Sequence, residues 1–262
     1  MNHGSVFSGI GGFDLAAERQ NIENIFHCEW IKSKRKILEH HFPKSISYGD
    51  IEKTDFSVHR GRIDILTGGF PCQDASIAKQ HGEGQQGLQG ERTGLFYEMC
   101  RAISEIRPKY IIAENVANIL KTNKGKDFSR ILTELSRLGY NAEWRVCRAS
   151  ELGAPHHRAR VYLVAYSNNI RLQSKETFFS YVESQKTPFS WQFAGTSVQI
   201  VRGNSWLHQP PVLCVDDGIS GKLDYTGNFI SEGLHGYGNA IVPAIAESIF
   251  KKIKEINQIT IK

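Results

Sequence analysis

The sequence has no long apolar run and no internal repeat. No stretch of its 262 residues approaches the ~20 consecutive apolar residues that a membrane-spanning helix needs, so we expect no membrane partner. The segment Met1 to Gly4 is followed by neither a basic region nor a long apolar stretch, so we also expect no secretory signal. Together these absences favour a cytoplasmic protein.

Closely spaced cysteines are also missing. The five cysteines, an odd number, are Cys28, Cys72, Cys100, Cys147 and Cys214. A disulfide framework and a zinc ribbon are both disfavoured by this spacing, and reduced thiols are expected. The adjacent pairs His40-His41 and His156-His157 do not face a common ligand on a helix, so no metal site is expected.

The composition is that of a folded globular protein. It is 40% hydrophobic, 10% aromatic and 23% charged, which argues against a disordered or fibrous chain. The formal net charge is +5, and segment 101–166 holds the excess, with 12 basic and 6 acidic residues. Such a segment suits a surface that binds a polyanion, although a modest excess is usually solvated charge.

Short apolar runs alternate with helical patterns. The runs that we predict to be buried strands are 5–10, 24–29, 63–67, 110–114 and 160–165. Apolar residues keep to one face in 95–106 and in 126–138, and 241–256 predicts a terminal helix. This alternation predicts an α/β fold with a mostly parallel sheet covered on both sides.

Two stretches interrupt the alternation. Residues 79–94 contain five glycines and almost nothing apolar, which predicts a mobile loop. Residues 167–235 mix polar and aromatic residues without a sustained period, which predicts a small, irregular or β-rich lobe inserted before the terminal helix.

A glycine-rich turn joins the first predicted strand to a helix. Gly9, Gly11 and Gly12 lie in this turn, where a ligand can approach the backbone at the carboxyl edge of the sheet. The next strand ends in Glu29-Trp30, which suits a carboxylate on a ribose hydroxyl pair beside a ring that stacks on adenine. A tight strand–helix turn with a core tryptophan is the structural alternative.

The cofactor that this pattern favours carries no phosphate. The dinucleotide pattern G-x-G-x-x-G is not met, because Gly12 follows Gly11 directly and position 14 is Asp. A pyrophosphate disfavours the carboxylate of Asp14 on the first helical turn. The pattern therefore favours S-adenosylmethionine over a nicotinamide cofactor.

Two further strand ends carry reactive side chains. The third strand is followed by Gly68-Gly69-Phe70-Pro71-Cys72-Gln73, a turn that makes a thiol accessible. The fourth ends in Glu114-Asn115-Val116, where a partly buried carboxyl group can stay protonated and act as an acid. Taken singly, Cys72 is more typical of a small core residue and Glu114 of a cap at a strand end. Together, the three strand ends supply a nucleoside pocket, a thiol and a carboxyl group.

Five motifs in this order make the chain resemble the DNA (cytosine-5)-methyltransferases of the bacterial or phage modification type. They are Phe7-Ser8-Gly9-Ile10-Gly11-Gly12, Pro71-Cys72-Gln73, Glu114-Asn115-Val116, Arg158-Ala159-Arg160 and Gly238-Asn239-Ala240-Ile241-Val242-Pro243. Each motif alone is weak, whereas the ordered set, which spans residues 7 to 243, is very specific.

The resemblance implies a covalent mechanism on a flipped base. Cys72 attacks carbon 6 of the target cytosine, and Glu114 holds the ring nitrogen. Carbon 5 then accepts a methyl group from S-adenosylmethionine, with S-adenosylhomocysteine as product and no metal. Arg160, together with Arg158, binds the flipped base and a nearby phosphate.

The resemblance also assigns the cofactor contacts and the domains. The implied contacts are Phe7, Gly9, Gly11, Gly12, Glu29, Trp30, Asp50, Ile51, Pro71, Leu95 and Asn239. The implied fold is a Rossmann-like methyltransferase sheet, with residues 1–166 as the catalytic and cofactor-binding domain. Residues 167–235 form the target-recognition lobe, and 236–262 form a terminal helix that returns to the catalytic domain. The implied partner is duplex DNA. A cognate restriction endonuclease is a second implied partner, although the sequence leaves its existence open. The protein is expected to be a monomer associated with the nucleoid.

The chain departs from the family pattern at three places. His156 stands where the family usually has Gln, and Ala240 stands where many members have Ser. The arginine- and leucine-rich block that normally precedes the last motif has no clear match, and Asp216 to Gly236 occupies its place. These departures, and the short lobe, affect DNA specificity more than chemistry.

Three other functions compete with this interpretation. A transfer-RNA cytosine methyltransferase shares the blocks, but its Cys-Phe-Thr signature is missing from 167–235. A nicotinamide-dependent oxidoreductase is disfavoured by the broken glycine pattern. A catalytically silent DNA-binding relative is disfavoured by the retained Cys72 and Glu114.

Overall fold

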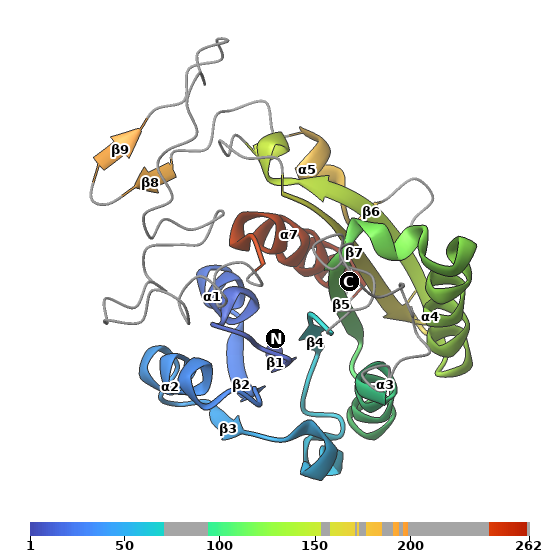
Figure 1. The fold of residues 1–262 in the computed structure, drawn as a ribbon, viewed down its shortest axis with the longest axis horizontal. Coiled ribbons are helices and arrows are strands. Elements are labelled where there is room, and N and C mark those ends of the chain that lie inside the picture. The colour runs from blue at the N-terminus through green and yellow to red at the C-terminus, as the bar shows by residue number, and fades with distance from the viewer. Residues whose placement is uncertain are drawn as a thin grey trace, which may run out of the picture.

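The computed structural model describes residues 1–70, 94–152, 158–170, 172, 177–184, 191–193, 196–198 and 241–260. Its centre is a seven-stranded sheet with the order β3-β2-β1-β4-β5-β7-β6 (Figure 1). The strands are β1 (Asn2–Val6), β2 (Glu23–Cys28), β3 (Ile46–Tyr48), β4 (Ile65–Gly68), β5 (Tyr110–Val116), β6 (Tyr140–Arg148) and β7 (Ala159–Ser167).

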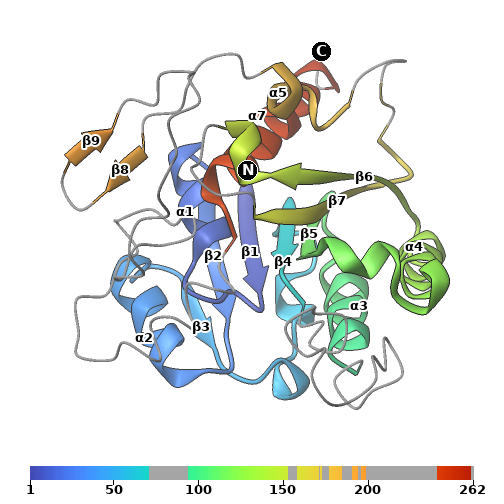
Figure 2. The ribbon, with the colours of Figure 1, turned by 45° about the horizontal axis from the view of Figure 1, so that its top comes forward.

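Six of the seven strands of this sheet point the same way, and β7 alone is reversed. β7 runs antiparallel both to β5 and to β6, and Figure 2 shows β6 and β7 side by side at one edge of the sheet. Because β3, β2, β1, β4 and β5 point the same way, their carboxyl ends lie along one edge. This edge is where loops that follow each strand can build a common site.

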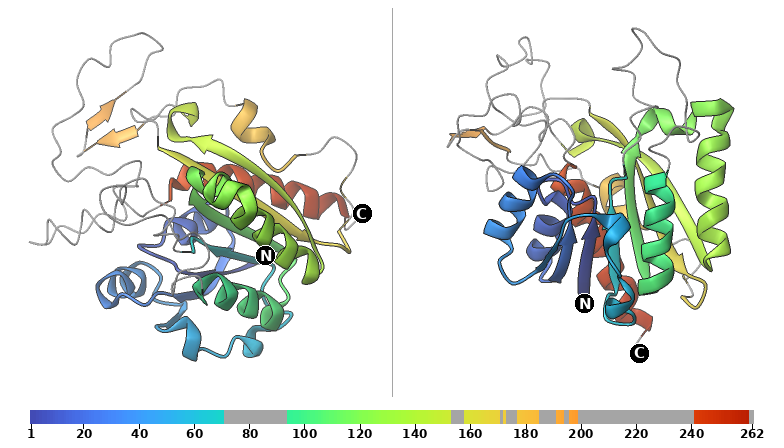
Figure 3. Two further views of the ribbon diagram at one scale, coloured as in Figure 1. Left: turned by 45° about the vertical axis from the view of Figure 1, so that its right-hand side comes forward. Right: turned by 60° about the horizontal axis from the view of Figure 1, so that its bottom comes forward.

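Helices cover both faces of the sheet. They are α1 (Gly12–Arg19), α2 (Lys32–His41), α3 (Gly94–Ile106), α4 (Lys126–Arg137), α5 (Ser180–Ser184) and α7 (Pro243–Thr260), with the 3-10 helices η1 (Ile51–Lys53), η2 (Ser57–His59), η6 (Ala117–Leu120), η7 (Thr122–Gly125) and η8 (Ala149–Leu152). Figure 3 shows α3 and α4 on the side of the sheet away from α1. The α/β sheet with two-sided cover that the sequence predicts is confirmed.

Alternation along the strands produces one apolar core on each face. In β5, Ile111 and Ala113 pack with α3 and α4, whereas Tyr110 and Ile112 pack with α1 and α7. Because β5 is buried on both faces, neither face carries polar residues over most of its length, and its sequence is a nearly continuous apolar run.

Helix α7 returns the end of the chain to the sheet. It begins at Pro243, which is tolerated there because the first helical amide has no partner within the helix. Ile245, Ile249 and Ile253 enter the same core as α1. Phe250 meets the His3 ring edge-on at 5.5 Å between ring centroids. The predicted terminal helix therefore packs on the central sheet.

The segment after β7 contributes both to this core and to a separate hairpin. Phe178, Phe179 and Val182 are buried in the core that contains α7, and α5 contacts α7. Further on, β8 (Trp191–Phe193) pairs antiparallel with β9 (Thr196–Val198) in a two-stranded sheet. In the described part of the chain, no helix is long and apolar enough to cross a membrane.

The expected elements differ from the observed ones at the sheet edges. The first strand ends at Val6, so residues 7–10 of the predicted strand 5–10 belong to the following loop. The sequence patterns did not predict β3, β6 or α2. β3 and β6 are edge strands with half-exposed residues, so neither carries the continuous apolar run by which the central strands were recognised.

Candidate active site

The loops after β1, β2 and β3 meet at the carboxyl edge of the sheet. The Ser8 amide donates to the Cys28 carbonyl at 3.1 Å, and the Glu29 amide donates to the Tyr48 carbonyl at 3.1 Å. These two bonds continue the strand ladders by one residue beyond the sheet. The sequence-predicted cofactor residues of all three loops are therefore brought to one place.

The glycine-rich loop has a backbone that favours glycine. Gly9 and Gly11 have φ angles of 59° and 89°, in the left-handed region. A Cβ built on Gly11 would lie 2.8 Å from the Leu38 side chain, so this glycine lets α1 pack on α2. A Cβ built on Gly9 would have nothing within 4 Å, so Gly9 leaves its side of the loop open to a ligand.

Glu29 ties the glycine loop to the end of β2. Its side chain is buried, with one carboxylate oxygen accepting from the Gly9 amide and the other from the Ile31 amide, both at 2.8 Å. Two amide donors hold the carboxylate in one orientation. Trp30, the next residue, is 69% exposed, so its ring is accessible to a stacking partner rather than part of the core.

The third loop places Asp50 and Ile51 beside these residues. The Asp50 carboxylate caps η1 by accepting from the Glu52 amide at 3.0 Å, and Ile51 is buried in the core. Arg101 of α3 donates to the Ile51 carbonyl at 2.5 Å and to the Thr54 carbonyl at 3.1 Å. Leu95, at the start of α3, is partly buried against the same core.

A buried polar network lies beneath the glycine loop. The Ser5 hydroxyl donates to the Asp14 carboxyl at 2.8 Å and lies 2.7 Å from the Ser8 hydroxyl. Burial raises the pKa of Asp14 to about 7, against the opposing effect of the Ser5 hydrogen bond. Asp14 therefore points into the protein, away from the surface where a cofactor can approach.

Glu114 and Asn115 connect β5 to the turn after β4. The Asn115 side-chain amide donates to the Phe70 carbonyl at 3.1 Å. A Cβ built on Gly69 would lie 3.5 Å from a Glu114 carboxylate oxygen. Sequence analysis gave Asn115 no role, although it lies inside a quoted motif; the structure shows that it anchors the residue two positions before Cys72.

Glu114 is buried and faces two arginines across the β5–β7 pair. The Arg160 Nε lies 3.1 Å from a Glu114 carboxylate oxygen, and the Glu114 side chain is 9% exposed. Burial raises the pKa of Glu114 above its ordinary value, while Arg160 and Arg158 oppose this effect. Burial therefore favours the protonated form of this carboxyl group, which is the form that can act as an acid.

The described cysteines are poor nucleophile candidates. Cys28, Cys100 and Cys147 are buried thiols. Burial raises the pKa of Cys28 and of Cys100 to about 12, so neither forms a thiolate readily. Of the five cysteines, Cys72 and Cys214 lie outside the described residues.

Three sequence-predicted site residues lie outside the described part: Pro71, Cys72 and Asn239. Residues 79–93 of the predicted loop 79–94, His156 and most of the predicted lobe also lie outside it, and Gly94 begins α3. Close to Asn239, Ile241 packs against the glycine loop, since a Cβ on Gly12 would lie 2.5 Å from Ile241 Cγ1. Within the described ranges, no group of three or more His, Cys, Asp or Glu residues could hold a metal ion.

The sheet order and the site at its carboxyl edge define a Rossmann-like methyltransferase fold. The structure resembles the Entamoeba histolytica methyltransferase EhMeth, with a TM-score of 0.54 and 21% identity over 69% of this chain and 59% of that one. It also resembles the Schizosaccharomyces pombe Dnmt2 methyltransferase, with a TM-score of 0.53 and 21% identity over 71% of this chain and 56% of that one.

The sequence comparison narrows this class to one family. Residues 1–208 match the family model described as C-5 cytosine-specific DNA methylase, so the chain belongs to that family. It is 37% identical to the Type II methyltransferase M.Sau3AI of Staphylococcus aureus over 63% of this chain and 43% of the relative. It is 35% identical to M.HpaII of Haemophilus parainfluenzae over 83% and 64%. The resemblance inferred from the motifs is confirmed.

The chain is shorter than these relatives. It spans about half the length of the curated relatives M.Sau3AI, M.NgoBI and M.HhaI that it matches. The matched residues 1–208 include the seven-stranded sheet, and the match ends before α7.

Proposed function

We propose that the protein transfers a methyl group from S-adenosylmethionine to carbon 5 of cytosine in a specific duplex DNA sequence, through a covalent Cys72 adduct with a flipped-out base. The observation that carries the proposal is the contact between β5 and the β4 turn. Asn115 holds the Phe70 carbonyl, and Gly69 lies against Glu114. Cys72 follows Phe70 by two residues, a chain reach of about 7 Å, so this contact supports a shared site for Cys72 and Glu114.

The roles of the two groups follow from their chemistry. Carbon 5 of cytosine is a poor nucleophile until the ring loses its aromaticity. A Cys72 thiolate forms a bond to carbon 6, and the proton held by Glu114 moves toward the ring nitrogen. After carbon 5 has gained the methyl group, a base removes its proton, and the electrons of that bond restore the double bond between carbons 5 and 6 that the thiolate addition had opened. The Cys72 sulfur leaves as a thiolate, and the proton on the ring nitrogen returns to Glu114. The net reaction replaces a proton by a methyl group and regenerates the thiolate.

Arg160 on β7 and Arg158, which directly precedes β7, supply the positive charge of this site. Arg160 contacts Glu114 directly, and both Arg160 and Arg158 lower the pKa of its carboxyl group. We propose that they also hold the flipped base and a neighbouring phosphate. This role suits arginine, because its planar group donates several hydrogen bonds at once.

The β1, β2 and β3 loops fit S-adenosylmethionine. Gly9 is open on one side, Glu29 offers a fixed carboxylate, and the Trp30 ring is exposed. We propose that Glu29 binds the ribose, that Trp30 stacks on the adenine and that Asp50 and Ile51 lie at its edge. When bound, S-adenosylmethionine supplies an electrophilic methyl group and leaves as S-adenosylhomocysteine. Phe7, Gly11, Gly12, Pro71, Leu95 and Asn239 complete the proposed contacts.

The proposed organisation assigns sequence choice to a separate lobe. We propose that residues 167–235 read the DNA sequence, while 1–166 and the helix within 236–262 form the catalytic body. Phe178, Phe179 and Val182 attach the start of the lobe to the core of that body. Relatives named Type II methyltransferases support a modification role with a cognate restriction endonuclease as partner. We propose that the protein acts as a monomer on DNA in the cytoplasm.

A trapping experiment tests the covalent step. Duplex DNA that carries 5-fluorocytosine in place of every cytosine removes the need to know the recognition sequence. The fluorine on carbon 5 cannot leave as a proton does, so the wild-type protein with S-adenosylmethionine is expected to form an adduct that survives denaturing electrophoresis. Cys72→Ser is expected to form none, and Cys214→Ser, the matched control, is expected to form the adduct normally.

The same variants identify the substrate. Bisulfite sequencing of DNA from cells that express the wild-type protein is expected to show methylated cytosines in one sequence context, and none with Cys72→Ser. Adduct formation by Cys72→Ser, or transfer of labelled methyl groups to transfer RNA and not to DNA, overturns the proposal.

A further inference from the structure

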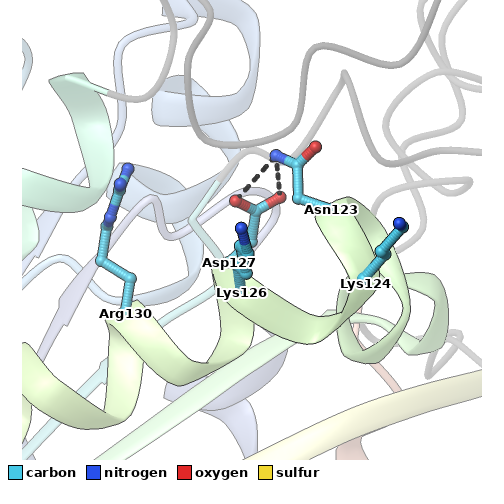
Figure 4. Close-up of a pocket in the computed structure, with 5 residues that line it drawn as sticks. All are labelled: Asn123, Lys124, Lys126, Asp127 and Arg130. Carbon is cyan, nitrogen blue, oxygen red and sulfur yellow. Dashed lines mark hydrogen bonds between the residues drawn. The ribbon is translucent and has the colours of Figure 1, made fainter.

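A basic pocket lies beyond the catalytic edge and takes no part in the proposed chemistry. It has a volume of about 310 Å³ and is lined by Asn123, Lys124, Lys126, Asp127 and Arg130. Figure 4 shows the Lys124 and Arg130 side chains projecting on either side of the Asn123–Asp127 pair. These five residues come from η7 and the first turns of α4. They belong to the basic segment 101–166 that the sequence singles out.

The exposed charge of this pocket is positive. Lys124, Lys126 and Arg130 are exposed, and within the described residues none of them forms an ion pair with a carboxylate. Asp127 is 3% exposed, and its two oxygens both accept from the Asn123 side-chain amide at 3.1 Å. Asp127 also lies in the first turn of α4, where the helix dipole stabilises a negative charge. The acid is therefore internally satisfied, and the three cations face the solvent.

The pocket is linked directly to the catalytic carboxyl group. β5 carries Glu114 and ends at Val116, and η6 and η7 follow without an intervening loop. A 3-10 helix rises about 2 Å per residue, so the eight residues from Val116 to Lys124 span roughly 16 Å at most along such a path. η6 also contacts β7, which carries Arg160. Glu114 precedes Val116 by two strand residues, which adds about 7 Å. The pocket therefore lies within about seven nucleotide steps of a base held at Glu114, since successive phosphates of one strand are spaced by about 3.4 Å along the duplex axis.

We propose that Lys124, Lys126 and Arg130 bind phosphates of the DNA backbone beside the flipped base. This inference rests on the proposed function, because it takes DNA as the substrate. A pocket with three exposed cations and a satisfied acid suits phosphate oxygens, which need charge and hydrogen-bond donors. Contacts to phosphates position the duplex and read no sequence. The pocket then fixes the DNA relative to Glu114, whereas base readout lies elsewhere.

The salt dependence of DNA binding tests this pocket. Binding of the full chain to a short, fluorescent, mixed-sequence duplex is measured by anisotropy over a salt series. Each phosphate contact contributes about −0.9 to the slope of log affinity against log salt, so Lys124→Gln/Lys126→Gln is expected to reduce its magnitude by about 1.8. At about 0.1 M salt this corresponds to roughly sixty-fold weaker binding. Lys124→Arg/Lys126→Arg is expected to keep the wild-type slope.

A matched variant controls for charge removal in general. Arg60 and Arg62 are exposed and precede β4, at the opposite edge of the sheet. Arg60→Gln/Arg62→Gln removes the same two charges and is expected to leave the slope unchanged. The pocket variant should also keep the wild-type methylated sequence and the wild-type affinity for S-adenosylmethionine.

The outcomes separate the two proposals. If the wild-type protein binds and methylates DNA, and the pocket variant has the wild-type salt slope, the pocket is solvated charge and this inference is overturned. An equal loss of slope in both double variants also overturns it, because the effect is then one of net charge. If the wild-type protein neither binds nor methylates DNA, the proposed function itself fails.

Discussion

Glu29 shows how one side chain can shape a loop as well as meet a ligand. Its carboxylate holds the Gly9 and Ile31 amides. The residue that the sequence suggests for a ribose is thus also the residue that connects the ends of β1 and β2. A carboxylate fixed in advance loses little conformational entropy when a ligand arrives.

Replacing Glu29 should weaken cofactor binding. Glu29→Ala removes a charge-assisted pair of hydrogen bonds, which contributes ~1.5–3 kcal/mol. Calorimetry is expected to show roughly ten- to a hundred-fold weaker binding of S-adenosylmethionine. Glu23→Ala, at the exposed opposite end of β2, is the control and should leave the affinity unchanged. An unchanged affinity in Glu29→Ala would assign this residue a capping role alone.

Asp14 makes stability depend on pH in the direction opposite to most acids. Its pKa is about 7 in the folded protein and near its ordinary 3.8 in the unfolded chain. Between these two values the unfolded chain ionises while the folded protein keeps its proton, so a rising pH lowers the free energy of unfolding. Below pH 3.8 both states are protonated, and above about 7 the penalty is constant.

Asp14→Asn should remove this dependence. Between the two pKa values the wild type should lose stability as the pH rises, whereas Asp14→Asn should not. The difference between their free energies of unfolding, variant minus wild type, is therefore expected to rise by at most about 1.4 kcal/mol per pH unit. Urea denaturation over a pH series measures it. Asp64→Asn is a control of opposite sign. Burial raises the pKa of Asp64, but Lys109 and the Asn2 amide together lower it by more than burial raises it, so the pKa lies below its ordinary value. Parallel curves for Asp14→Asn and the wild type would contradict the prediction.

At the scale of elements, the contact between the start of α1 and the approach to α7 joins the two ends of the chain. Gly12 is the first residue of α1 and lies against Ile241, two residues before α7. Arg19 of α1 also pairs with Glu247 of α7 at 2.7 Å. The glycine loop is therefore supported from below by a helix that follows more than two hundred residues later.

Gly12→Ala should destabilise the protein, and the size of the loss should depend on the side chain at position 241. The added methyl group would lie 2.5 Å from Ile241 Cγ1, and overpacking of this kind costs about 1–3 kcal/mol. Ile241→Ala alone leaves a cavity and costs about 2–5 kcal/mol. The double variant is expected to lose less than the sum, because each change compensates the other. Gly94→Ala, which meets no atom within 4 Å, is the control and should be nearly neutral; strict additivity would refute the contact.

At the scale of the whole molecule, we propose that one body performs the chemistry and that a later segment chooses the sequence. Both apolar cores belong to the sheet and its helices, and they include residues from the first and the last elements of the chain. The β8–β9 hairpin pairs only with itself within the described residues. A division of labour of this kind predicts that changes in the lobe alter specificity without altering the cofactor site.

Arginines of the proposed lobe test this division. Arg171→Ala and Arg202→Ala, both outside the described residues, are expected to relax the preferred sequence and to leave S-adenosylmethionine binding intact. An arginine that reads guanine contributes ~1–3 kcal/mol of discrimination. Methylation profiles over a random-sequence library measure the preference. If neither variant changes it, and a lobe from a relative does not change it either, sequence choice resides in 79–94 or in 101–166.

Much of the central sheet and of the site could be predicted from the sequence alone. Continuous apolar runs identify strands that are buried on both faces, and these gave β2, β4, β5 and β7 to within a few residues. Motif order was sufficient for the family, because glycines, a thiol and carboxyl groups recur at successive strand ends. The edge strands β3 and β6 were not predictable in this way, since half-exposed strands carry no such run.

Only the tertiary structure decided which side chains support the site. The bond from Asn115 to the Phe70 carbonyl joins residues 45 positions apart, and the Arg101 bonds to the η1 region span about 50. The antiparallel placement of β7 sets Arg160 beside Glu114. The raised pKa values of Asp14 and Glu114 come from burial that the fold imposes. Local patterns determine strands, turns and reactive groups, whereas burial and long-range hydrogen bonds exist only once the chain has folded, because they depend on residues that are distant in sequence.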